Sequence, residues 1–211
     1  MSGAAALVTE ALRLNARYVE EVVIGWGLCP WAAQAWRDGA VARRVLIPAA
    51  PEQAGDQTPE HAPAIDSVLA FIDELASAPA TSIGLAIFPR ATPTAAAWGT
   101  FAERVRRADR ARRSPDAAAP FLLAAFHPGS GNSASEAGNP GALVSFLRRT
   151  PDPTLQLVRA SLLDGLARQG RDLSGEIARA NFAAVGARTP AALDALVREI
   201  RSDRDASYAR L

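Results

Sequence analysis

Two side chains in this sequence have the chemistry of a catalytic pair: the single cysteine, Cys29, and one of the two histidines, His127. Cys29 stands at the predicted start of a short helix over residues 30–38. Unpaired backbone N–H groups and the helix dipole at such a position favour a thiolate. A thiolate with an imidazole nearby can act as a nucleophile with a general acid or base. We therefore expect Cys29 and His127 to be the catalytic residues.

Polar residues near His127 are candidates for holding a substrate. His127 follows a predicted strand, and Arg90 follows another, so parallel strands would place both at one edge of the sheet. The candidate substrate-binding residues are Arg90, Asn132, Asn139 and Arg148. The arginines among them would hold an anionic group of a small-molecule substrate.

The composition removes several other mechanisms. All 23 basic residues are arginine, so the chain has no Schiff-base lysine and no phosphate-loop lysine. One cysteine and two histidines do not supply a zinc site of several Cys and His ligands. A single ligand is enough for haem, however. The first alternative is therefore a haem- or mononuclear-metal-dependent oxidoreductase or lyase with His127, or Cys29, as the ligand; the thiol mechanism itself requires no cofactor.

A second alternative is a non-catalytic binding or accessory module. Six arginines lie between Arg104 and Arg113 on a predicted helix, where they could bind an acidic partner. The net charge of the chain is only +1 and no aromatic residues interleave with these arginines. This favours a solvated helix face and argues against a nucleic acid partner. The apolar content and the number of helices make a homo-oligomer a further expectation.

The elements that must position these residues alternate between strands and helices. Apolar runs predict strands over residues 41–47, 82–88 and 121–126, with helices between them. This order indicates an α/β fold with a small, three-stranded parallel sheet wrapped by about seven or eight helices. A ferredoxin-like, antiparallel α+β arrangement is the alternative.

The rest of the chain completes a single domain over residues 1–211. Apolar spacing predicts a helix over residues 4–24, and polar, Pro- and Gly-rich segments predict loops at 48–63 and 128–141. After residue 139 we expect helices only, with Leu155, Val158, Leu162 and Leu166 on one buried stripe. Asn139, Asp152 and Thr189, each followed by Pro, are predicted N-caps, and Ser174 is a fourth candidate.

The sequence also carries expectations about location. The first residues lack a basic start followed by an apolar run and a cleavage site. No stretch approaches the roughly 18 uninterrupted apolar residues of a membrane span. We therefore expect a cytoplasmic protein without a membrane partner.

Two segments resemble the bacterial domain-of-unknown-function 1415 family. Residues 22–36, VVIGWGLCPWAAQAW, are similar to its Val-Val-Ile-Gly-x-x-Leu-Cys-Pro-Phe block, with Trp31 in place of Phe. Residues 125–148, AFHPGSGNSASEAGNPGALVSFLR, contain the Phe-His-Pro part of a Ser-Phe-His-Pro block. The resemblance implies no reaction, because the family has no assigned function. It does cover Cys29 and His127, and so it ranks these two residues first.

The chain also departs from the family pattern. Family members are similar to one another in an Asn-Arg-Ser-Pro-Tyr-Pro segment that leads into a helix with a His. This chain has AGNPGA at residues 137–142 and Ser145 at the corresponding places. If that Arg and His serve the family's function, the resemblance implies a divergent member with altered chemistry.

Overall fold

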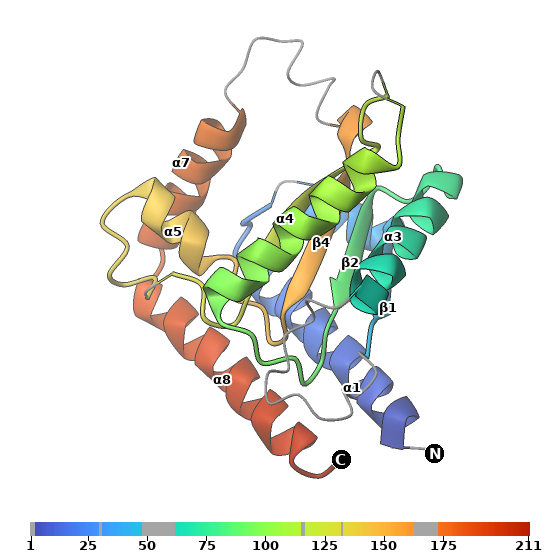
Figure 1. Cartoon of the computed structure of the whole chain (residues 1–211). Helices are drawn as coiled ribbons and strands as arrows, with labels where there is room; N and C mark the ends of the chain where they lie inside the picture. Colours follow the sequence, from blue (N-terminus) through green and yellow to red (C-terminus); the bar gives the residue numbers. More distant parts are fainter. Residues whose placement is uncertain (1–2, 30, 48–61, 115–116, 132, 163–172) are drawn as a thin grey trace.

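The structure, a computed structural model, describes residues 3–29, 31–47, 62–114, 117–131, 133–162 and 173–211. Within these residues the chain has an α/β fold, in which eight helical segments surround a four-stranded mixed sheet (Figure 1). The fold class and the number of helical segments agree with the sequence prediction. None of the described helices is long and apolar enough to cross a membrane.

Three strands form where the apolar runs predict them: β1 (Val41–Val45), β2 (Ile83–Ile87) and β3 (Phe121–Phe126). β1 and β2 pair in parallel, with Val41 opposite Ile83. β3 runs in the same direction, because one further strand is antiparallel to both β2 and β3. The carboxyl ends of the three predicted strands therefore share one edge of the sheet, as expected.

That further strand, β4 (Thr154–Arg159), corrects the prediction of a three-stranded parallel sheet. It lies between β2 and β3, and the strand order is β1-β2-β4-β3. The ferredoxin-like alternative is also wrong in its antiparallel pairing, because β1 and β2 are parallel. A single inserted strand thus changes both the size and the type of the sheet.

The sequence of β4 explains why a helix was the wrong prediction for this segment. Leu155 and Leu157 are fully buried on one face, whereas Thr154 and Gln156 alternate with them on the other. This period of two suits a strand with a different environment on each face. The expected helical stripe rested on the spacing of three between Leu155 and Val158; its last member, Leu166, lies outside the described residues.

Helices α3 (Ala62–Ser77) and α4 (Ala95–Ala111) cover one face of the sheet (Figure 1). Aromatic side chains fill the space beneath α4. The ring of Phe88 meets that of Trp98 edge-to-face at 5.1 Å between centroids, and Trp98 stacks on Phe101 at the same distance. These contacts form the main core of the protein.

The other face is covered by the N-terminal helices. α1 (Gly3–Arg17) continues directly into a π-helix, η1 (Tyr18–Ile24), so the expected helix over 4–24 is confirmed in extent. The π-helical geometry was not predicted. Its wider turn is closed by bonds such as that from the Gly25 N–H to the Glu20 carbonyl, 2.9 Å. The next helix, α2, spans Ala32–Arg37.

Three helices complete the fold: α5 (Pro140–Phe146), α7 (Leu173–Gly186) and α8 (Pro190–Tyr208). The predicted N-caps Asn139 and Thr189 are confirmed. The same prediction is wrong for Asp152, which precedes the strand β4, and Ser174 lies inside α7. The expected loops are shorter than predicted, because residues 62–63 belong to α3 and residues 140–141 to α5. Residues 48–61 lie outside the described part of the chain.

Two glycines test the packing of α3 and α4 against the sheet. A Cβ added to Gly84 on β2 would overlap the Leu75 side chain and lie 3.3 Å from the Phe71 ring. We expect Gly84→Ala to lower the free energy of unfolding by about 1–3 kcal/mol through overpacking. Gly99 in α4 has open space around it, so Gly99→Ala should raise the free energy of unfolding by up to about 1 kcal/mol through helix propensity. Urea unfolding measures both changes. If Gly84→Ala and Gly99→Ala changed the free energy of unfolding by the same amount and in the same direction, the packing described here would be contradicted.

Candidate functional site

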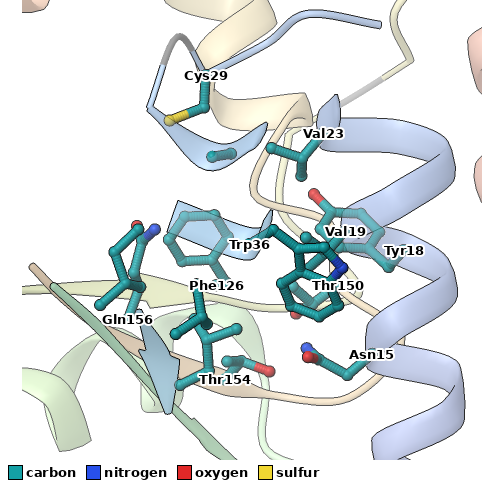
Figure 2. Close-up of a pocket in the computed structure, with 14 residues that line it drawn as sticks. Asn15, Tyr18, Val19, Val23, Cys29, Trp36, Phe126, Thr150, Thr154 and Gln156 are labelled. Atoms are coloured by element: carbon teal, nitrogen blue, oxygen red, sulfur yellow. The ribbon is translucent and has the colours of Figure 1, made fainter. Parts of the chain in front are cut away.

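A cavity of about 70 Å³ lies between the sheet and the N-terminal helices, and we call it the sheet cavity (Figure 2). In the same measure one water molecule needs about 10–15 Å³, so a small organic group fits. Most of the lining is apolar: Val19, Val23, Ala32, Trp36, Val41, Ile83, Leu85 and Phe126. No charged side chain lines the sheet cavity among the residues that the structure describes.

The local structure of two elements creates this space. On β4, Thr154 and Gln156 face the N-terminal helices and present small or polar groups. In η1, Tyr18, Val19 and Val23 all lie on the wall of the cavity. A π-helix displaces side chains from the positions of a regular α-helix, and π-helical turns are frequent at functional sites. The widened helix and the polar strand face together leave the cavity open.

Asn15 is the most unusual residue of the sheet cavity. Its side chain comes from α1, is only 3% exposed, and has an Oδ1 atom with no hydrogen-bond partner. A buried polar atom without a partner costs about 1–3 kcal/mol. The neighbouring hydroxyls differ, because Thr150 and Thr154 both donate to the Asp152 carbonyl, at 2.7 and 2.9 Å. Asn15 therefore has an unfilled bonding position beside two hydroxyls that are satisfied.

Cys29 also lines the sheet cavity and is half-buried. Figure 2 shows it across the cavity from Asn15 and Thr154. Cys29 was predicted at a helix N-cap, but the N-cap of α2 is Trp31, two residues later. The Cys29 carbonyl instead accepts the N–H of Ala32 in a turn, at 3.2 Å. The thiol thus owes its place to this turn, not to a helix N-terminus.

His127 is placed differently from Cys29. Phe126, the last residue of β3, lines the sheet cavity, whereas His127 is not among its lining residues and has its ring bonded to the loops at Pro93 and Gly129. Its Nδ1 accepts the Gly129 N–H at 3.0 Å, so Nε2 carries the proton and donates to the Pro93 carbonyl at 2.9 Å. The structure therefore does not bring Cys29 and His127 into one cavity. It does confirm that the loops after β2 and β3 meet.

Three of the four candidate substrate-binding residues, Arg90, Asn139 and Arg148, do not line the sheet cavity either. Arg90 is exposed and has a left-handed backbone, with φ of 63°. Arg148 is exposed, and its carbonyl accepts the His127 N–H at 2.9 Å. The Asn139 side chain caps α5 by accepting the Ala142 N–H at 2.9 Å. Asn132 lies outside the described residues.

Sequence reasoning missed Asn15, Gln156 and Arg149. A signal for Asn15 was present, because it falls four residues after Ala11 and three before Tyr18 on the apolar side of the first helix. Gln156 was hidden by the incorrect helix prediction. Arg149 is half-buried, whereas its neighbour Arg148 is exposed. The two residues are of the same type, and no local pattern shows which of them points inward.

Among the described residues, neither His127 nor Cys29 has the surroundings that the haem or metal alternative requires. The one lone pair of the neutral His127 ring already accepts the Gly129 N–H. The sheet cavity beside Cys29 is far smaller than a porphyrin. Nor does any group of three or more His, Cys, Asp or Glu side chains that could hold a metal ion occur in the described part of the chain.

The arginines of α4 form contacts within the protein. Arg106 donates to the Leu123 carbonyl of β3 at 2.8 Å. Arg112 and Arg113 both bind the buried carboxylate of Asp109, at 2.8 and 2.6 Å. Burial would raise the pKa of Asp109, but the two guanidinium groups outweigh it and lower the pKa. Part of the Arg104–Arg113 cluster thus attaches α4 to its surroundings.

Comparison with known proteins identifies the family. Residues 10–194 match a family model described as a protein of unknown function, DUF1415. The chain belongs to the DUF1415 family. No curated protein and no solved structure matches this DUF1415 chain. The two segments that carry the resemblance meet at the sheet cavity, because Val23 and Cys29 come from the first and Phe126 from the second.

The bonded position of His127 predicts a pH-dependent stability. Burial lowers the pKa of His127, and the nearby Arg201 charge lowers it further, while the bond to the Pro93 carbonyl opposes this. The unfolded chain then binds the proton more tightly than the folded one. We expect the free energy of unfolding to be constant above the ordinary pKa of about 6.5 and to fall as the pH drops below it.

Urea unfolding between pH 7.5 and 5 measures this dependence. His127→Gln should flatten it, whereas His61→Gln, the control at the other histidine, should leave it unchanged. In NMR titrations the imidazole signal that is lost in His127→Gln should titrate below pH 6.5. A signal that titrates at or above this value would contradict the bonding described for His127.

Proposed function

We propose that this DUF1415 protein is a small-molecule enzyme that binds an uncharged, mainly apolar substrate in the sheet cavity, with the Cys29 thiol as its reactive group. The observation that carries the proposal is the buried, unpartnered Oδ1 of Asn15 in a cavity that also exposes the single cysteine of the chain. A ligand that donates a hydrogen bond to Asn15 would remove the cost of this atom.

The lining of the cavity indicates the chemistry of the substrate. The absence of charged groups from the described lining favours a neutral molecule, because an ion would lose its hydration without a counter-charge. The aromatic rings of Trp36 and Phe126 suit a flat apolar body. Asn15 and Gln156 would orient it through an N–H or O–H group and a second polar atom. This pattern of apolar walls with a few polar groups is typical of small-molecule sites.

The arrangement gives Cys29 and His127 separate roles. Cys29 is the nucleophile: its sulfur adds to a polarised double bond of the substrate, so that a C–S bond forms while the π bond breaks. The thiol proton passes to the electron pair so released, directly or through solvent, because no imidazole or carboxylate is among the residues described as lining the cavity. His127 is a positioning residue that connects the loops at the carboxyl ends of β2 and β3 through Pro93 and Gly129. The rate of such an enzyme would depend on how the sheet cavity binds the substrate and on how accessible the Cys29 thiol is.

Replacement of Asn15 separates stability from binding. We expect Asn15→Leu to raise the free energy of unfolding of the free protein by about 1–2 kcal/mol, because it removes a buried atom without a partner. Thr154→Val is the matched control, at another polar residue that lines the same cavity. It should lower the free energy of unfolding by about 1 kcal/mol, because the Thr154 hydroxyl donates to Asp152. Urea unfolding measures both, and a destabilised Asn15→Leu would contradict a ligand role for Asn15.

Alkylation of Cys29 tests the site directly. The chain has one cysteine, so intact-mass measurement of iodoacetamide labelling reports on this thiol alone. Uncharged, partly aromatic amides and alcohols are screened for protection. We expect a ligand that raises the melting temperature of the natural protein also to slow the labelling of Cys29. In Asn15→Leu the same ligand should slow labelling at least tenfold less.

A substrate found in this way then tests catalysis. Cys29→Ser should bind it and keep the fold but lose turnover, whereas His127→Gln should keep part of the activity at neutral pH. Stabilising ligands that never protect Cys29, or full turnover by Cys29→Ser, would overturn the proposal.

A further inference from the structure

A second, smaller cavity lies on the other side of Tyr18 and Thr150, which contribute to the walls of both cavities. Its remaining lining comes from the loops around Pro128 and Arg149 and from α8. The space is about 10 Å³, close to what a single water-sized atom requires. It is therefore suited to one oxygen atom of a ligand whose remainder lies at the mouth of the cavity.

Two arginines line this cavity: Arg149 from the segment before β4 and Arg201 from α8. Arg149 is half-buried and stacks on Phe146. Its Nε and Nη2 donate to the carbonyls of Ser130 and Gly131, at 2.6 and 2.7 Å. These bonds fix the guanidinium and leave its Nη1 without a hydrogen bond to the residues that the structure describes.

No carboxylate of the described residues compensates the charge of Arg201. Arg201 is exposed and makes no ion pair or hydrogen bond within the described part of the chain. The acidic groups of α8 are all engaged elsewhere: Asp194 with Ala134 and Ser135, Glu199 with Arg17, Asp203 with Arg13 and Arg17, and Asp205 with Arg204. Arg201 therefore adds an uncompensated positive charge beside Arg149.

The electrostatics of the neighbours agree with this placement. Burial lowers the pKa of Arg149, the carboxylate of Asp194 opposes this, and the like charge of Arg201 lowers the pKa further, with a smaller opposing effect of Glu136. Arg201 also lowers the pKa of His127, after burial. An anion between the two arginines would relieve this repulsion.

We propose that the cavity between Arg149 and Arg201 binds an oxyanion, the phosphate or carboxylate group of a small molecule. Guanidinium groups donate paired N–H bonds in the geometry that such oxyanions accept. The free Nη1 of Arg149 and the whole guanidinium of Arg201 supply the donors. This site does not rest on the reaction proposed for Cys29, because it uses neither the thiol nor Asn15.

Titration with inorganic phosphate and, separately, with acetate tests the site. Binding is followed at constant ionic strength by ¹H–¹⁵N NMR of the whole chain. We expect saturable shifts centred on Arg149, Thr150 and Arg201, and the stronger of the two ions shows which oxyanion is preferred. Arg201→Ala should weaken binding of the ion about tenfold or more, because it removes charged hydrogen bonds to the oxyanion.

Arg148→Ala is the matched control, because it removes the same charge from an exposed neighbour that does not line the cavity. It should change the affinity by less than about twofold. Arg201→Lys keeps the charge but not the paired donors and should be intermediate. Equal losses in Arg148→Ala and Arg201→Ala, or no saturable binding of either ion, would overturn the proposal. Labelling of Cys29 is expected to be unchanged in Arg201→Ala, so a failure here is distinguishable from a failure at the sheet cavity.

Discussion

The antiparallel pairing of β4 with both β2 and β3 holds this protein together, because β3 would otherwise have no partner in the sheet. The start of β4 is anchored by Asp152. Its carboxylate accepts a bond from Arg204 at 2.7 Å and one from the Tyr208 hydroxyl at 2.6 Å, both on α8. The last helix of the chain is thereby attached to the middle of the sheet. A buried carboxylate with two such partners is costly to disturb.

The same strand also separates the core from the candidate site. Leu155 and Leu157 pack under α3 and α4, while Thr154 and Gln156 face the N-terminal helices. Because strand residues alternate between faces, one hexapeptide supplies both the tightest packing and the polar wall of the sheet cavity. The cavity and its unpartnered Asn15 can persist because the opposite face supplies the hydrophobic stabilisation.

The family resemblance gains a physical meaning from this arrangement. Its first segment forms the end of η1 and the turn that carries Cys29, and its second forms the end of β3 and the loop of His127. Both segments reach the sheet cavity, through Cys29 and Phe126. His127 instead supports the loops at the sheet edge. Residues that stand together in a sequence pattern can thus serve a site in two ways, by lining it and by fixing the backbone around it.

The sequence by itself determined the three apolar strands, the long N-terminal helix and the caps at Asn139 and Thr189. Each of these depends on neighbours along the chain: a run of apolar residues, a helical period, or an Asn or Thr before Pro. Only the tertiary structure decided that β4 enters the sheet, that Asn15 is buried without a partner, and that Cys29 and His127 point to different places. Those outcomes depend on contacts between residues far apart in the chain, and a local pattern records the type of a side chain but not the direction in which the fold turns it.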